Sequence, residues 1–166
     1  MSNSAILKAV LADRFSYSAE NCSIHRSLEI VGERWTLLVL REAFYGVRRF
    51  EDFVRVLGCP RDALSARLKT LVDEGIMRRE PYREPGRRPR NEYRLTEKGL
   101  ELFPALLALL QWGDRWTADP NGPAVELTHR ECGEPLEMTM GCTGGHTHLS
   151  VRDVAATPGP GARRVA

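Results

Sequence analysis

The stretch RRFEDFVRVLGCPRDALSARLKTLVDEG, residues 48–75, predicts two short amphipathic helices joined by a tight turn. The break falls at Gly58-Cys59, and Pro60 follows it in the first turn of the second helix, where a missing N–H costs no hydrogen bond. The second helix ends at Gly75 and carries one apolar stripe, formed by Leu64, Leu68 and Leu71. Two helices connected in this way indicate a helix-turn-helix.

The neighbouring segments predict further helices and one hairpin. Apolar residues recur at helical spacing in three segments ahead of the pair, residues 5–15, 22–32 and 33–46. After the pair, two extended segments, residues 76–83 and 91–96, flank an arginine-rich Pro-Gly turn and predict a β-hairpin. Thr96 then caps a long helix that continues to Trp116. This order of elements predicts a mainly α (α+β) fold, a winged helix-turn-helix with a long C-terminal dimerisation helix and a small C-terminal appendage.

Positive charge is concentrated around the predicted hairpin. Residues 60–94 hold ten Lys or Arg against six Asp or Glu, whereas the whole chain has a formal net charge of only +2. An arginine-rich loop by itself is often only solvated. In this position, however, the loop at about residues 83–91 becomes a wing that lies beside the DNA backbone. The residues expected to contact phosphates are Arg87, Arg88 and Arg90.

The second helix of the pair, about residues 60–74, is the predicted recognition helix, the element that enters the DNA major groove. When its leucines face inward, helical periodicity brings four side chains together on the opposite face: Arg61, Asp62, Ser65 and Lys69. These side chains are short enough, or basic enough, to approach base edges and phosphates. Arg67 lies beside this face, where it either contacts DNA or forms a surface salt bridge.

The order of these motifs resembles the HxlR-type winged-helix transcriptional regulators over about residues 20–116. The markers are Cys22, Gly32 with Trp35, Arg41-Glu42, RRF at 48–50, LSARLKTLVDEG at 64–75 and EYRLTEKG at 92–99. The resemblance implies a homodimeric bacterial regulator that binds double-stranded operator DNA, has no enzymatic activity and uses no cofactor. It favours repression and dimerisation through the first and last helices. A two-fold dimer presents two recognition helices and therefore predicts a near-palindromic operator.

We therefore expect four regions along the chain. They are an N-terminal dimerisation helix over 1–18, a DNA-binding domain with the last dimer helix over 19–117, a Cys- and His-containing appendage over 118–154, and a flexible tail over 155–166. No export signal or membrane segment is recognisable, because the longest apolar run, residues 102–110, is far too short to span a bilayer. A cytoplasmic location is expected.

Cys22 is the candidate sensor of an oxidant or another inducer. It is the first residue of the helix predicted over 22–32, and the partial positive charge of a helix N-terminus favours the reactive thiolate. His25 lies on the same face of that helix, and a cysteine in this position looks to serve as a sensor in several relatives. The alternative is a packing role, since free cysteine is among the most buried residue types. Cys59, in the turn before the recognition helix, is a second and weaker candidate.

The appendage contains a possible metal-ligand set, His129 and Cys132 with Cys142 and either His146 or His148. Longer relatives look similar here but have a Cys-x-x-Cys pair. In this chain Gly145 replaces the second cysteine, which excludes a four-thiolate site. The alternative is a small β-rich flap with two half-buried thiols, and from the sequence we assign no metal.

Two other functions compete with that of a DNA-binding regulator. A protein-interaction adaptor would keep the winged fold without binding DNA, and the arginine-rich wing argues against it. A zinc enzyme built on the same Cys and His residues would need an acidic general base in a recognisable motif, and Glu131 and Glu137 are only sequence neighbours of those residues.

Overall fold

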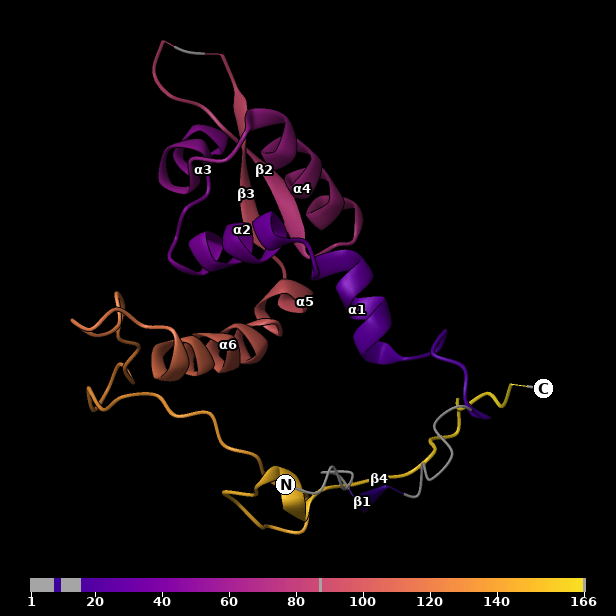
Figure 1. Ribbon diagram of the computed structural model, residues 1–166. Helices are drawn as coiled ribbons and strands as arrows, with labels where there is room; N and C mark the ends of the chain where they lie inside the picture. The colour runs from indigo at the N-terminus through magenta and orange to yellow at the C-terminus, as the bar shows by residue number, and fades with distance from the viewer. Residues whose placement is uncertain (1–7, 10–15, 87, 166) are drawn as a thin grey trace. The chain divides into compact units, whose positions relative to one another are not determined.

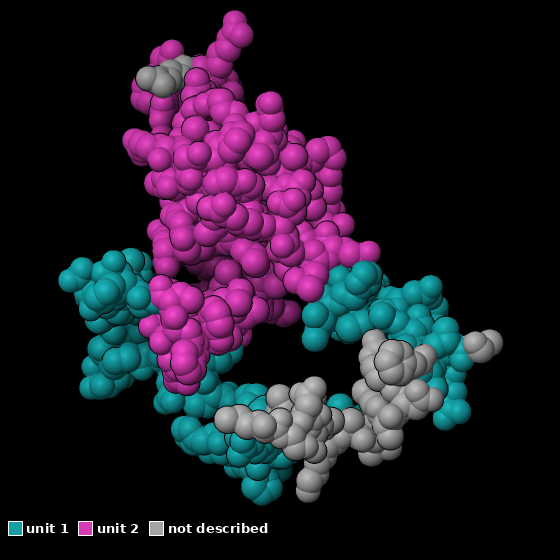
Figure 2. All heavy atoms as spheres, in the orientation of Figure 1, with its two compact units in different colours: residues 1–26, 118–166 teal, residues 27–117 magenta. Residues whose placement is uncertain are grey.

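The computed structural model describes residues 8–9, 16–86 and 88–165. The chain divides into two compact units (Figure 2), one formed by residues 27–117 and the other by residues 1–26 together with 118–166. The first unit ends at Thr117 and begins inside a helix, between residues 26 and 27.

The predicted helix-turn-helix and wing are confirmed. In chain order the helical part contains α1 (Ser23–Val31), α2 (Arg34–Phe44), α3 (Phe50–Leu57) and α4 (Arg61–Asp73). The hairpin follows as β2 (Met77–Tyr82) and β3 (Arg90–Leu95), and its loop extends beyond α3 and α4 (Figure 1). Gly58 ends α3 in the left-handed conformation, with φ of 59°, and so supplies the sharp turn into α4.

The core lies between α2, α3, α4 and the start of β2. The three leucines expected to face inward from α4 are completely buried, as are Val39 and Leu40 of α2 and Phe53 of α3. Trp35 and Phe50 are half-buried and pack against this core. Because α4 is anchored along its whole inner face, its outer face is held rigidly for contact with a partner.

Paired charges stabilise the wing. The antiparallel register places Arg78 opposite Arg94 and Glu80 opposite Glu92, so like charges face each other directly. Arg94 Nε instead pairs diagonally with Glu80 on the other strand, at 2.8 Å, and along its own strand with Glu92, at 2.6 Å. Hydrogen bonding to Glu92, with the charge of Glu80, raises the pKa of Arg94 above its ordinary value. The backbone of Arg48 extends the sheet, since Tyr93 N donates to Arg48 O at 2.8 Å.

The contacts at the connection between the wing and the last helices explain why the sequence there is LTEKG. The Thr96 side chain accepts a hydrogen bond from Gly99 N, which confirms the predicted N-cap, and donates to Gly75 O at 2.6 Å. A Cβ at Gly99 would collide with the carbonyl oxygen of Ile76. A glycine is therefore required at position 99, because any larger residue would push this helix away from the start of β2.

The long helix predicted from Thr96 to Trp116 is wrong as a single element. The structure has α5 (Glu97–Leu100) and then α6 (Phe103–Trp116), with Pro104 in the first turn of α6. A proline has no N–H, and its ring clashes with the carbonyl four residues earlier, which here belongs to Leu100, the last residue of α5. The break changes the direction of the chain and lets Phe103 of α6 pack against Phe44 of α2, with ring centroids 5.1 Å apart.

The two terminal segments pair with each other, and the N-terminal one differs from the sequence prediction. Lys8–Ala9 form strand β1, parallel to β4 (Ala155–Ala156), where a helix was expected over 5–15; the other residues of that segment lie outside the described part of the chain. The tail predicted to be flexible is hydrogen-bonded to residues 16–21: Ser18 N donates to Arg163 O and Val165 N to Ser16 O, each at 2.9 Å. This backbone pairing joins two segments that are far apart in the sequence. Neither segment carries a periodic pattern from which the pairing could be predicted.

Candidate nucleic-acid interface

The outer face of α4 carries the side chains expected to read DNA. Asp62 and Ser65 are exposed in the N-terminal half of the helix, and Lys69 is exposed one turn further on. The buried residues of α4 are the three leucines, which lie on the opposite face. Arg67 is half-buried beside the outer face. The four residues predicted to share a face are thus all on the surface of α4.

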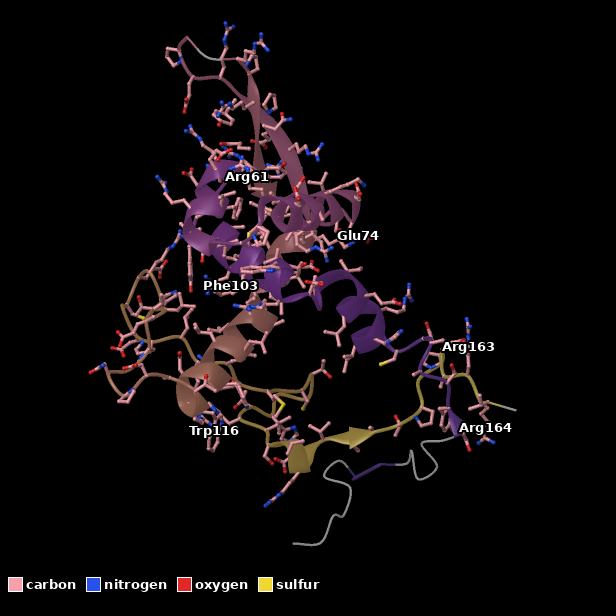
Figure 3. All side chains as sticks on the ribbon, turned by 45° about the horizontal axis from the view of Figure 1, so that its top comes forward. Arg61, Glu74, Phe103, Trp116, Arg163 and Arg164 are labelled. Carbon is pink, nitrogen blue, oxygen red and sulfur yellow. The ribbon has the colours of Figure 1, made fainter. Side chains whose placement is uncertain are left out.

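Arg61, at the N-terminal end of α4 (Figure 3), is already engaged within the protein. Its guanidinium makes two hydrogen bonds with the carboxylate of Glu51 on α3, at 2.5 and 2.9 Å, and lies 5.0 Å from the centre of the Phe50 ring. The hydrogen bond from Arg61 lowers the pKa of Glu51, with the charge of Arg90 contributing. Arg61 can meet DNA only by sharing or leaving this carboxylate.

Lys69 is also paired, with Asp73 one turn along the same helix at 2.5 Å. Both partners are well exposed, so water and salt screen this pair and its contribution to stability is small. A phosphate can therefore replace the carboxylate of Asp73 at little cost. Lys69 remains suited to a phosphate contact.

The wing loop projects arginines from the end of the hairpin. Arg88 and Arg90 are exposed, and Arg90 is the first residue of β3. Gly86, at φ of 73°, supplies the left-handed residue of the turn. Arg87, the third residue predicted to contact phosphate, lies outside the described residues. The two arginines that are described have the exposure that a backbone contact requires.

Arg49 has a role that the sequence did not reveal. It precedes α3, its guanidinium lies 4.4 Å from the centre of the Tyr82 ring of β2, and it forms an ion pair with Glu84 at 2.6 Å. Arg49 thus connects the helix-turn-helix to the base of the wing loop. The RRF motif drew attention to Arg49 in the sequence, but it gave no information about the contacts of this residue.

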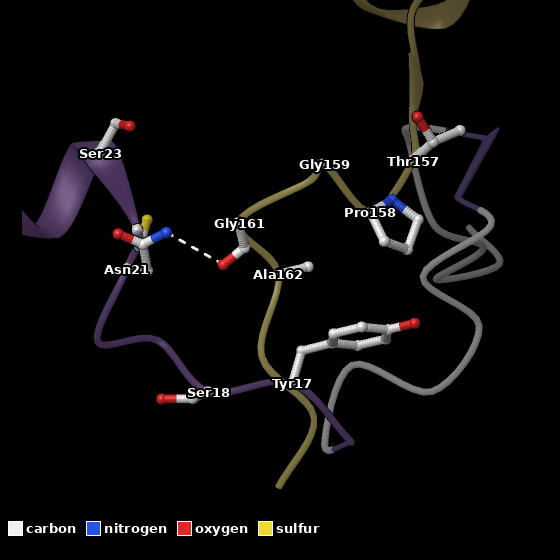
Figure 4. A pocket seen from close by; sticks show the side chains of 10 residues that line it. Tyr17, Ser18, Asn21, Ser23, Thr157, Pro158, Gly159, Gly161 and Ala162 are labelled. Atoms are coloured by element: carbon white, nitrogen blue, oxygen red, sulfur yellow. Dashed lines mark hydrogen bonds between the residues drawn. The ribbon is translucent and has the colours of Figure 1, made fainter.

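Cys22 lies directly before α1, which begins one residue later than expected from the sequence, and is half-buried. Its N–H donates to Ala19 O, and its carbonyl accepts from Arg26 N in the first turn of the helix. An open pocket beside it is lined by the turn at residues 17–23 and by the tail at residues 157–162 (Figure 4), where Asn21 Nδ2 donates to Gly161 O at 2.9 Å. Cys59 is buried in the core, with 5% of its surface exposed, which makes it a poor target for an oxidant.

A helix-turn-helix with an exposed recognition helix and a basic β-wing defines the class: this is a winged-helix transcriptional regulator. The HxlR-like helix-turn-helix family model matches residues 30–121, more than half of the chain. The protein belongs to that family. Among the helices of the described residues, none combines the length and apolar character needed to cross a bilayer.

The similarity to relatives extends beyond the residues that the family model matches. The HTH-type transcriptional regulator Rv3095 of Mycobacterium tuberculosis is 49% identical over 146 residues, which cover 88% of this chain and 91% of the relative. The crystal structure of PA1607, a candidate transcription factor, has a TM-score of 0.73 at 36% identity and covers 82% of this chain and 94% of its own. The oxidised form of the redox regulator HypR has a TM-score of 0.53 at 29% identity, covering 59% of this chain and all of that one (100%).

Proposed function

We propose that this protein is a homodimeric repressor that binds a near-palindromic operator with α4 in the major groove and the wing on the phosphate backbone. The observation that carries the proposal is the division of α4 into a fully buried leucine face and an exposed polar face, next to the exposed arginines of the wing. The protein acts by binding DNA and not by catalysis, and it works in the cytoplasm, where its operator lies.

The dimer is proposed to form through α6. Three large apolar side chains, Leu109, Trp112 and Trp116, recur along one face of this helix and are 53%, 60% and 69% exposed. A lone domain gains nothing from two exposed tryptophans on one stripe, whereas a second copy of the chain would bury them. The α1 helix also leaves Ile24 and Leu28 exposed and is a second candidate for the same interface. A contribution of residues 1–18 to this dimer interface, expected from the sequence, is proposed as well.

Cys22 is proposed as the residue through which an oxidant or electrophile relieves repression. Its place before α1 and the open pocket beside it support this assignment, as does the similarity to a protein described as a redox regulator. Modification of this thiol would act directly on the first turn of α1, the helix that also carries the exposed Ile24 and Leu28.

The decisive experiment is a binding titration of the full chain with labelled DNA from the region upstream of its own gene. A regulator should bind this DNA specifically, with an affinity at least about 10³-fold above that for unrelated DNA at the same salt concentration. An adaptor that keeps the fold without binding DNA would show equal, weak binding to both, and that result would overturn the proposal.

A further inference from the structure

The appendage, residues 118–154, is described throughout and has no hydrophobic core of its own. None of its residues is fully buried, and several of its larger apolar side chains face solvent, Met138 and Met140 among them. Yet the segment is not irregular, because its backbone forms two short hairpins, at residues 127–136 and 140–149. Segments of this size that lack a core are usually stabilised by disulfides or by a metal ion.

The first hairpin brings a histidine and a cysteine together at its tip. His129 N donates to Glu134 O and Gly133 N donates to His129 O, both at 2.8 Å, with Gly133 in the left-handed conformation at φ of 76°. This turn holds His129 Nδ1 and Cys132 Sγ 3.2 Å apart.

The second hairpin repeats the arrangement with the residue order reversed. Cys142 N donates to His146 O and Gly145 N donates to Cys142 O, both at 3.0 Å, with Gly145 at φ of 86°. Here too the sulfur and the imidazole Nδ1, those of Cys142 and His146, are 3.2 Å apart. Gly145, which removes the second cysteine of a Cys-x-x-Cys pair, is thus the turn residue that brings His146 back to Cys142.

The spacing within each pair suits a metal ion. Tetrahedral Zn²⁺, at about 2.3 Å from sulfur and about 2.0–2.1 Å from nitrogen, sets neighbouring ligand atoms about 3.5 Å apart. Both cysteines are exposed, so the half-buried thiols of the alternative interpretation are not what the structure has. Within the described part of the chain no three Cys, His, Asp or Glu side chains yet surround a common point, so each turn is half of a site.

We propose that one Zn²⁺ per chain joins the two turns, with His129, Cys132, Cys142 and His146 as its four ligands. Residues 137–139, which belong to neither hairpin, form the connection at which one turn can fold onto the other. Each thiol releases its proton to solvent as its sulfur binds, so two thiolates neutralise the ion and the imidazoles bind as neutral groups. The site is structural, since four protein ligands leave no open position for a substrate. His148 is not a ligand, because the turn geometry selects His146.

The test is the metal content of the full chain, purified without a His-tag or chelator. About one equivalent of zinc is expected, and replacement by Co²⁺ should give the visible bands of a tetrahedral site together with a thiolate-to-cobalt charge-transfer band. The wild-type spectrum needs no variant and therefore does not depend on how a mutant folds. Zinc below about a tenth of an equivalent that cannot be restored by added Zn²⁺ would overturn the proposal.

Variants assign the ligands. Cys132→Ser and Cys142→Ser should each lose zinc, because both turns bind the same ion. His146→Ala should also lose zinc, whereas the matched control His148→Ala should keep it. Retention of full zinc by either cysteine variant, or loss only in His148→Ala, contradicts the assignment. An unchanged helical circular dichroism signal would show that the winged unit of each variant is intact. The result is independent of the DNA-binding titration, since the ligands lie outside residues 27–117.

Discussion

The carboxylate of Glu51 holds the guanidinium of Arg61 by two hydrogen bonds, and so α3 binds the first residue of the recognition helix before any DNA does. This hydrogen bond lowers the pKa of Glu51, so its carboxylate stays ionised further into the acidic range than that of a free glutamate. The contribution of the pair to stability is present above the unfolded-state pKa of Glu51 and is lost as the pH falls through its lowered folded-state value. At neutral pH, phosphate must compete with Glu51 for Arg61.

Glu51→Gln should therefore strengthen DNA binding. The substitution removes a negative charge that competes with phosphate, and a newly formed Arg61–phosphate contact should steepen the dependence of log K on log salt concentration by about 0.9. Fluorescence anisotropy titrations over a range of salt concentrations measure both effects. Glu126→Gln, which removes an exposed carboxylate of the appendage outside the proposed DNA interface, is the matched control for charge removal. Weaker binding by Glu51→Gln would mean that Glu51 positions Arg61 for its contact.

Substitutions on the recognition helix and substitutions on the wing should affect DNA binding in different ways. Ser65→Ala or Arg61→Ala should alter sequence preference, at a cost of about 1–3 kcal/mol if the side chain bonds to a base. Arg88→Ala or Arg90→Ala should weaken binding to every sequence alike and lower the salt slope by about 0.9 for each phosphate no longer neutralised; Arg87→Ala is expected to behave in the same way. Arg130→Ala, an exposed arginine of the appendage, is the control. Wing variants that bind normally at every salt concentration would rule out the phosphate contacts.

Trp112→Ala combined with Trp116→Ala should convert the dimer into a monomer without unfolding it. Both side chains are exposed in the single chain, so their removal leaves the core intact and deletes only surface available to a second copy. Sedimentation velocity gives the oligomeric state, and circular dichroism checks the helices. Operator affinity should fall with the dimer, because two linked half-sites, about 34–36 Å apart on the DNA, reinforce one another. Leu100→Ala, an exposed apolar residue outside the stripe, should remain dimeric. If the double-tryptophan variant is still a dimer, α6 does not hold the dimer together. The interface would then be sought in α1 and by truncation of residues 1–18.

Oxidation of Cys22 should weaken operator binding, and a thiol reductant should restore it. Treatment with diamide or hypochlorite, followed by mass spectrometry to locate the modified thiols, separates Cys22 from the exposed Cys132 and Cys142. Cys22→Ser should bind DNA equally well with and without oxidant, whereas Cys59→Ser should keep the wild-type response. Unchanged affinity of the wild-type protein after confirmed oxidation of Cys22 would end the redox proposal.

Gly99→Ala should destabilise the winged unit by about 1–3 kcal/mol, since the new methyl group must displace the start of β2. Gly113→Ala, in the middle of α6, is the contrasting variant: its Cβ would meet only the Thr117 side chain, at 3.6 Å, and higher helix propensity should stabilise it by about 1 kcal/mol. Thermal or urea unfolding of both variants measures the difference. Equal stability of the two would show that the close approach at Ile76 relaxes freely.

Local sequence was sufficient to define the helix-turn-helix and its wing. The leucine stripe of α4, the Gly58 turn, the Thr96 cap and the Pro-Gly loop are signals readable within one or two turns of chain, and all four agree with the structure. The exposed face of the recognition helix followed from the buried one by periodicity alone. Pro104 is a local signal of the same kind, which the prediction of one continuous last helix overlooked, and it divides that helix in two.

Only the folded chain establishes which partners the charged and metal-ligating side chains have. The ion pair of Arg61 with Glu51 and the contact of Arg49 with Tyr82 join residues on different elements, and no spacing within either element encodes them. The pairing of the C-terminal tail with residues 16–18 is long-range in the same sense. The choice of His146 over His148 depends on a left-handed glycine that reverses the chain. Such contacts follow from how packed elements meet in space, and periodicity along one segment carries no information about them.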